Sequence, residues 1–331
     1  MITFRTEVSM PKVNRKLSYR QNALMVGSCF TENIGSNLQD VCFPVLVNPC
    51  GILYNPASMA GCIDFLVSEK HVEASELFNA NGLWNNFSFH SRFSSPDKES
   101  ALTAMNKSLS QASSQLRSAS HFFLTFGTSW VYRDKESGAI VGNCHKLPSD
   151  RFTRERLTVE EMTDQWVGLL DKLFAVNPKL IIVLTISPVR HLKDGSYENQ
   201  VSKSCLFLLA DQLLSRFGTE KITYFPSYEL VMDELRDYRF YASDMLHLSE
   251  TATAFVQEKF NGVFLDKESM EISSGIEKIV KSLIHKPFRP ENSAYQDLLS
   301  QLSEEANQLA ARYPYVNFER LIIDIIQKKD L

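Results

Sequence analysis

The sequence has few of the features that mark fibrous, disulfide-rich or zinc-stabilised proteins. Only 13 glycines and 12 prolines occur in 331 residues, which excludes fibrous and low-complexity classes. The six cysteines contain no C-x-x-C pair, so a structural zinc site is not expected. With no secretion signal in view, they indicate reduced thiols rather than a disulfide framework. We therefore expect neither a bound metal ion nor a cofactor.

Long hydrophobic segments and an excess of positive charge are also missing. The longest apolar run, Leu180 to Ile186, is far shorter than the roughly 18 residues that span a bilayer. Residues 1–16 alternate apolar and charged side chains and show no signal peptide. The formal net charge of −4 argues against nucleic acid as the main partner. These absences predict a cytoplasmic protein without a membrane span.

Short apolar runs separated by amphipathic stretches dominate the first 225 residues. The runs are Ala23 to Val26, Phe43 to Val47, His121 to Phe126, Leu180 to Ile186 and Ile222 to Phe225. Parallel strands need long crossovers of this kind, and strands covered on both faces have continuous apolar sequences. The pattern predicts a three-layer α/β fold with a five-stranded parallel sheet.

The remaining chain divides into an insertion and a helical end. We expect an α/β domain over residues 1–265, with an insertion at about 66–120, and a helical extension over 266–331. The aromatic segment Phe78 to Pro96 is more typical of an ordered loop packed on its own domain than of a lid. The C-terminal helices are predicted to form either an appendage or a contact in a homo-oligomer. The expected helices are Pro56 to Ser68, Lys98 to Ser118, Glu250 to Phe260, Glu271 to Leu283, Tyr295 to Arg312 and Phe318 to Gln327.

The segment Met25-Val-Gly-Ser-Cys-Phe-Thr-Glu-Asn-Ile-Gly35 is the most informative one for chemistry. A strand ends at Gly27 and a helix starts near Cys29, with Glu32 at a capping-box position. A thiol at a helix N-terminus meets the positive end of the helix dipole and free N–H groups, which favour the thiolate. The alternative is a tight turn in which Cys29 is a small buried hydrophobe, and the spacing alone slightly favours this alternative.

A second candidate lies after the last predicted strand. Asp244 and His247 are three residues apart in a loop before a helix capped by Ser249, so the carboxylate can orient the imidazole as a base. Taken alone this is a weak motif, because a surface histidine beside a helix cap is the commoner explanation.

Together these segments resemble the SGNH (GDSL-like) hydrolase superfamily, and more closely the GSCFA family, after Gly27-Ser-Cys-Phe30. The resemblance extends to Phe126 to Tyr132, Asn143 to Lys146, Ser187 to His191 and Asp237 to His247. It implies the sheet order 2-1-3-4-5 and puts Cys29 at the position of the nucleophilic serine, with Ser28 as the alternative nucleophile.

The same resemblance implies further site residues. Gly51 matches the oxyanion-hole glycine, Ser129 stands in the place of the oxyanion-hole asparagine, and Asn143 is a substitute donor if its loop folds back. Possible substrate-binding residues follow the strands or lie in the matched segments. They are Arg190, His191, His145 and Trp130.

Three functions remain open at this level. The first is a hydrolase or acyltransferase acting on an ester or acyl group of a small molecule or glycan, with Cys29 as nucleophile, His247 as base and Asp244 as its orienter. The second is a non-catalytic ligand-binding protein on a degenerate fold, since cysteine replaces serine and serine replaces asparagine. The third, a phosphate-binding turn, lacks the glycine-rich loop and lysine of a P-loop.

Overall fold

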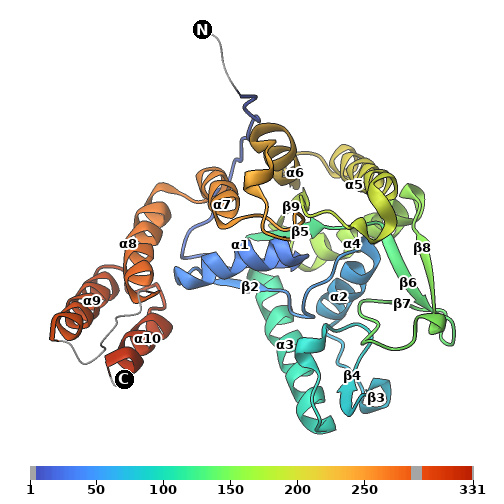
Figure 1. Cartoon of the computed structure of the whole chain (residues 1–331), viewed down its shortest axis with the longest axis horizontal. Coiled ribbons are helices and arrows are strands. Elements are labelled where there is room, and N and C mark those ends of the chain that lie inside the picture. The colour runs from blue at the N-terminus through green and yellow to red at the C-terminus, as the bar shows by residue number, and fades with distance from the viewer. Residues whose placement is uncertain (1–4, 285–292, 330–331) are drawn as a thin grey trace.

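A parallel sheet of five strands forms the centre of the molecule (Figure 1). The computed structural model describes residues 5–284 and 293–329. The strand order is β2-β1-β5-β9-β10, which confirms the predicted order 2-1-3-4-5 with the first strand inside the sheet. All four strand pairings are parallel. The strands are β1 (Ala23–Gly27), β2 (Val45–Val47), β5 (His121–Phe126), β9 (Ile181–Ile186) and β10 (Ile222–Tyr224).

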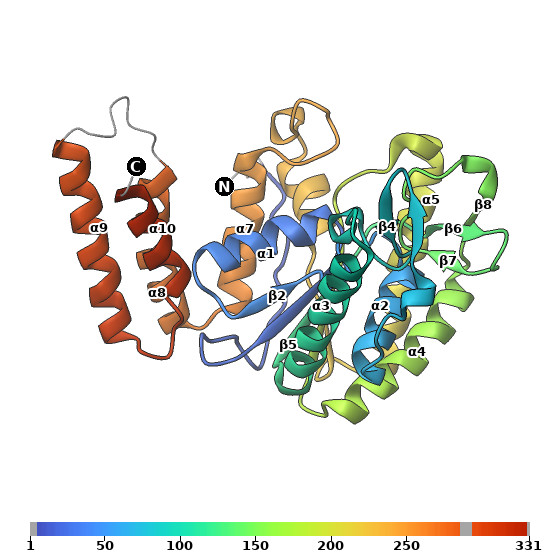
Figure 2. The same cartoon turned by 90° about the horizontal axis from the view of Figure 1, so that it is seen from below.

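Helices cover both faces of this sheet (Figure 2). Alternate residues of β1 belong to different cores: Leu24 and Val26 pack on one face, and Ala23 and Met25 on the other. Burial on both faces explains why the strands have continuous apolar sequences. The first face carries α2 (Pro56–Ser68), α3 (Lys98–Ser118), α4 (Val159–Val176) and α5 (Gly195–Phe217); the second carries α1 (Cys29–Asp40) and α7 (Glu250–Phe264).

Two small antiparallel sheets were not predicted from the sequence. Their strands are two to five residues long and partly exposed, so they lack a strong hydrophobic pattern. The first pairs β3 (Phe78–Ala80) with β4 (Leu83–Asn85), and the second joins β6 (Trp130–Asp134) to β7 (Ile140–Val141) and β8 (Phe152–Arg156). Phe89, in the same aromatic segment as β3 and β4, is fully buried in the main core, so this segment packs on its own domain as expected.

The chain ends in the three predicted helices, α8 (Lys267–Ile284), α9 (Ser293–Arg312) and α10 (Glu319–Lys329). Short α6 (Ser227–Glu229) and a π-helical turn at Leu230–Leu235 precede α7. The apolar faces of α8, α9 and α10 continue the core that covers α1 and α7. A division at about residue 265 stays a prediction.

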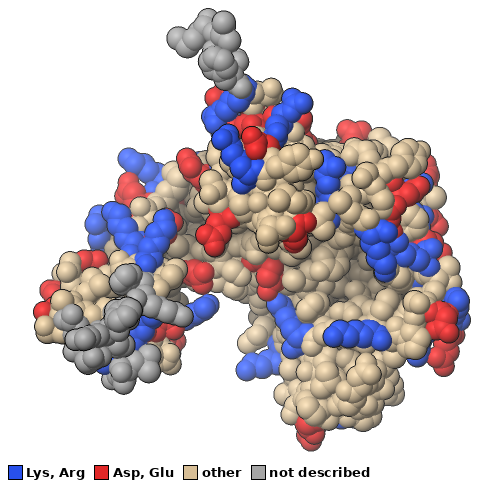
Figure 3. Space-filling view, viewed as in Figure 1, with Lys and Arg blue, Asp and Glu red and all other residues tan. Residues whose placement is uncertain are grey.

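Charges of both signs are interspersed over the face seen in Figure 3. Within the described residues, no helix is long and apolar enough to cross a membrane.

Candidate functional site

The turn between β1 and α1 is held by a network of polar side chains. The Gly27 N–H donates to Asn48 Oδ1 (2.8 Å), and Asn48 Nδ2 donates to Glu32 Oε2 (2.6 Å). Arg92 forms an ion pair with Glu32 (2.9 Å) and bonds the carbonyl of Asn48. Glu32 does not form the predicted capping box, because the N-cap of α1 is Ser28 and the Glu32 carboxylate bonds Asn48 and Arg92 instead, which ties the helix to the end of β2 and to the aromatic segment.

Ser28 and Cys29 occupy different positions in this turn. Ser28 is the N-cap of α1, is 1% exposed, and accepts the N–H of Phe30 (3.3 Å) through Oγ. Cys29 is the first helical residue and is half-buried. The Ser28 hydroxyl therefore caps the helix, whereas the Cys29 thiol lies partly exposed near the surface.

The electrostatic state of Cys29 differs from the expectation. Burial raises the pKa of this thiol above its ordinary value. The N–H groups of Phe30 and Cys29 and the positive charge of Lys203 act in the opposite direction but are outweighed, while the nearby charge of Asp244 raises the pKa further. The prediction that the helix end lowers this pKa is wrong, because desolvation of the sulfur exceeds the effect of two amides and one ammonium group.

Asp244 and His247 form the predicted pair. Asp244 Oδ2 lies 2.6 Å from His247 Nδ1, and Oδ1 accepts the N–H groups of Leu246 and His247, both at 2.9 Å. These bonds lower the pKa of Asp244 to about 2, so the carboxylate is ionised. Both side chains are about half exposed. With Nδ1 engaged, the free edge of the imidazole is Nε2.

His191 lies near the same place, beside the loop after β5. Its ring meets that of Tyr54 edge-on, with centroids 5.5 Å apart, and a Cβ built on Gly127 would lie 3.3 Å from His191 Nε2. Nε2 is buried and has no hydrogen-bond partner among the described residues. Burial lowers the pKa of His191 to about 4, with smaller contributions from Lys203, Arg154 and His247. The imidazole is therefore neutral at physiological pH.

Lys203 is a residue that the sequence reasoning missed. It is fully buried on α5, and Nζ donates to the carbonyls of Gly127 (2.6 Å) and Ser187 (2.7 Å). The available signal was its register: Lys203 lies three residues before Leu206, on the buried face of α5. A lysine in such a register indicates a specific partner for its charge.

The three residues expected to supply oxyanion donors are engaged elsewhere. The Gly51 N–H donates to the carbonyl of Asn48 (2.7 Å), and Ser129, which is fully buried, bonds Ser202 on α5 through its N–H (2.8 Å) and Oγ (3.0 Å). The side chain of Asn143 bonds Ser91 and the backbone of His145. Their predicted role has no support in this geometry, because each donor already has a partner within the fold.

The proposed binding residues have different environments. His145 is buried and bonds the carbonyl of Asn86 (2.9 Å), an arrangement that stabilises the aromatic segment. The ring of Trp130 lies under the guanidinium group of Arg154, 4.8 Å from its centroid.

Arg190 is half-buried, contacts Met232 Sδ (3.3 Å) and exerts its charge on Lys203. Among the sequence candidates, Asp244 contacts His247 and acts on the pKa of Cys29, and His247 acts on the pKa of His191. Arg190 has no such link to these four residues among the described contacts and acts on Lys203.

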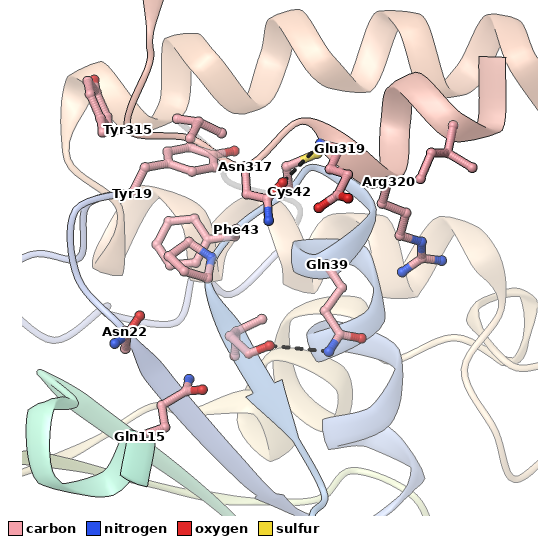
Figure 4. A pocket seen from close by; sticks show the side chains of 14 residues that line it. Tyr19, Asn22, Gln39, Cys42, Phe43, Gln115, Tyr315, Asn317, Glu319 and Arg320 are labelled. Atoms are coloured by element: carbon pink, nitrogen blue, oxygen red, sulfur yellow. Dashed lines mark hydrogen bonds between the residues drawn. The ribbon is translucent and has the colours of Figure 1, made fainter. Parts of the chain in front are cut away.

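A cavity of about 570 Å³ lies at the opposite edge of the sheet (Figure 4). It is lined by residues that precede β1 and β2, such as Asn22 and Phe43, and by Tyr315 and Arg320 at the C-terminal helices. Cys29 follows the carboxyl end of β1 and does not line it. In the part of the chain that the structure describes, no group of three His, Cys, Asp or Glu residues could hold a metal ion.

The chain matches two family descriptions. Residues 22–260 match the GSCFA family, and residues 276–328 match the GSCFA domain protein, C-terminal domain. The first match covers most of the chain, so the protein belongs to the GSCFA family. No curated protein matches it.

Several solved structures share the general arrangement at low identity. A carbohydrate esterase family 3 from Talaromyces cellulolyticus is 6% identical, with a TM-score of 0.37, over 77% of this chain and 99% of that chain. A carbohydrate esterase family 2 enzyme from Corynascus thermopiles (Myceliophthora fergusii) is 11% identical, with a TM-score of 0.37, over 81% and 68%. An acetyl xylan esterase from Butyrivibrio proteoclasticus is 11% identical, with a TM-score of 0.37, over 74% and 63%. At these scores the likeness carries no argument about activity.

Proposed function

We propose that the protein is a hydrolase or acyltransferase that acts on an ester or acyl group, with Cys29 as nucleophile, His247 as general base and Asp244 as its orienter. The observations that support this proposal are the Cys29 thiol on the first turn of α1 and the hydrogen-bonded Asp244–His247 pair, whose aspartate charge acts on the pKa of that thiol. Cys29 is preferred to Ser28 because the serine hydroxyl is buried and caps the helix.

The raised pKa of Cys29 determines how the first step proceeds. Because the thiol is protonated at neutral pH, a base must remove its proton during attack, as in a serine hydrolase. His247 takes this proton while sulfur bonds to the acyl carbon. The protonated imidazole then donates the proton to the departing alcohol as the ester bond breaks, leaving a thioester on Cys29.

The second step restores the thiol. His247 removes a proton from water or from an acceptor hydroxyl, whose oxygen bonds to the acyl carbon as the carbon–sulfur bond breaks, and the proton returns to sulfur. Of the two N–H groups that act on the sulfur, that of Phe30 already donates to Ser28 Oγ, so we assign stabilisation of the developing negative charge to the N–H of Cys29. Water as acceptor gives hydrolysis, and a sugar or small-molecule hydroxyl gives transfer.

The test is hydrolysis of p-nitrophenyl acetate and of acetylated sugars. We expect Cys29→Ala and His247→Ala to lower turnover at least about 100-fold while the fold is retained. Cys144→Ser is the matched control, since this cysteine is also half-buried but lies in a turn of another segment, and it should leave turnover unchanged. If Cys29→Ala leaves turnover unchanged, Cys29 is excluded as the nucleophile. Absence of turnover across the panel would favour the ligand-binding alternative.

A further inference from the structure

A groove of mainly uncharged polar side chains crosses the start of the edge strand β2, at the end of the sheet opposite to Cys29. It consists of the cavity of about 570 Å³ in Figure 4 and a neighbouring hollow of about 660 Å³ between α1 and α3. The two share Asn22, Gln39, Val45 and Gln115 as lining residues, so they adjoin. Each is within the range of about 300 to 1,000 Å³ that is typical of ligand sites.

The amide side chains of this groove are held by the ends of the strands. Gln39 Nε2 donates to the carbonyl of Val45 (3.2 Å), and Gln115 Nε2 donates to the carbonyl of Ala23 (2.8 Å), the register partner of Val45 on β1. Asn22 Nδ2 donates to a serine hydroxyl at the end of α3 (3.3 Å). The oxygens of these three amides have no hydrogen-bond partner among the described residues. The groove thus presents three half-buried acceptors in orientations that the fold determines.

Charged side chains contribute little to the lining of the groove. None of the nine residues that line the hollow between α1 and α3 is charged, although 22% of the chain is Asp, Glu, Lys or Arg. The two charged residues that line the cavity, Glu319 and Arg320, belong to α10, and Arg320 also faces Asp40 at 3.8 Å. A ligand with a net charge therefore meets no opposite charge along most of the groove.

Aromatic and aliphatic side chains complete the lining. The rings of Tyr19 and Phe43 pack together with centroids 4.8 Å apart, and Tyr315 and Ile323 add apolar surface from the C-terminal helices. A sugar has the matching chemistry, because its hydroxyl groups donate to amide oxygens and accept from amide or hydroxyl donors, while its C–H faces pack on aromatic rings.

An extended peptide is the other uncharged occupant to weigh, because β2 is an edge strand. Adding a strand requires free main-chain groups along that edge. The carbonyls of Val45 and Val47 accept the side chains of Gln39 (3.2 Å) and Arg92 (3.4 Å), and the Val45 N–H donates to the carbonyl of Phe43 (2.8 Å). These groups already have partners, which favours the sugar over the peptide.

We propose that this groove is a binding site for an uncharged oligosaccharide, in which Asn22, Gln39 and Gln115 accept hydrogen bonds from its hydroxyl groups. The site is independent of the chemistry proposed for Cys29, because it lies at the other edge of the sheet and sugar binding there requires no acyl transfer.

The experiment titrates the full chain with cellotetraose, xylotetraose, maltotetraose and chitotetraose and follows the NMR shifts of the backbone amides. We expect at least one of these sugars to bind with a Kd below about 10 mM and to shift the amides of Gln39 and of residues 110–118. A tetramer of galacturonic acid, which is negatively charged, should bind at least about tenfold more weakly.

Two variants of the groove and one matched control complete the test. Ser114→Arg places a long charged side chain in the groove from an exposed position and should raise the Kd at least about tenfold. Gln39→Met keeps the length of the side chain, removes the amide and should raise the Kd about fivefold, the effect of one hydrogen bond. Thr103→Arg is the control, because Thr103 is exposed on the same helix as Ser114 but lines neither hollow, and its Kd should not change.

Absence of binding by all four sugars up to about 20 mM, shifts that cluster outside the groove, or an unchanged Kd in Ser114→Arg overturns the proposal. Tighter binding of a blocked hexapeptide of serine and threonine also overturns it and assigns the groove to a peptide. Cys29→Ala separates this site from the proposed function, since sugar binding should be unchanged in that variant. Sugar binding without any ester turnover would retain the groove and reject only the enzymatic function.

Discussion

Replacement of Gly27 by alanine tests the geometry on which the candidate site depends. A Cβ at this position would lie 2.5 Å from Thr31 Oγ1, 2.6 Å from the carbonyl oxygen of Thr125 and 2.8 Å from Thr125 Cβ. Thr125 is the register partner of Gly27 on β5, so its carbonyl cannot retreat without disturbing the ladder between β1 and β5. Overpacking of this kind costs about 3 kcal/mol in the free energy of unfolding.

The assay is urea unfolding at pH 7, with Gly61→Ala as the matched control. Gly61 lies on the exposed side of α2, and a Cβ there meets no atom within 4 Å. The same methyl group should stabilise that variant by about 1 kcal/mol, because alanine is the better helix former. We expect the change in the free energy of unfolding to have opposite signs in the two variants. A loss below about 1 kcal/mol in Gly27→Ala would refute the close approach of β1, β5 and α1.

Three further outcomes follow from single side chains. Asp244→Asn should lower ester turnover less than His247→Ala does, since a misoriented imidazole retains part of its function; equal losses contradict this order. Asp134→Asn should destabilise the fold at pH 7, because the Arg151 guanidinium lowers the pKa of Asp134 to about 2. The stability difference is fully present above the ordinary carboxyl pKa of about 4 and should vanish as the pH falls through 2, as followed by thermal melts. His145→Ala should lower thermal stability without changing the KM of the folded enzyme, because this imidazole bonds a loop carbonyl.

Local patterns determined much of what could be read from the sequence. The helices at Pro56–Ser68 and Lys98–Ser118 were predicted with their observed bounds, because a capping residue and an apolar period are both local signals. The pairing of Asp244 with His247 is likewise a contact between residues three apart. The position of Cys29 at the start of α1 follows from the end of an apolar strand at Gly27.

The small strands around Trp130 and the roles of Gly51, Ser129 and Asn143 depended on the tertiary structure. Ser129 bonds Ser202 and Asn143 bonds Ser91, in segments far away in the sequence, whereas the Gly51 N–H donates within its own turn to Asn48. A match to a family position identifies the residue but not whether its donor is free. That is decided by every other group that the fold brings within hydrogen-bond distance.

The pKa of Cys29 likewise depends on both local sequence and tertiary structure. Sequence alone places a thiol at a helix N-terminus and predicts a lowered pKa, because the dipole and the end amides are local properties of α1. The tertiary structure buries the sulfur and brings in Lys203 from α5 and Asp244 from the last loop. Desolvation depends on all atoms that surround a group, and Lys203 is 76 residues away in sequence from one of the carbonyls it bonds. The sequence thus identified Cys29, Asp244 and His247 as candidates, whereas the ionisation of Cys29 depends on the packing of distant segments around it.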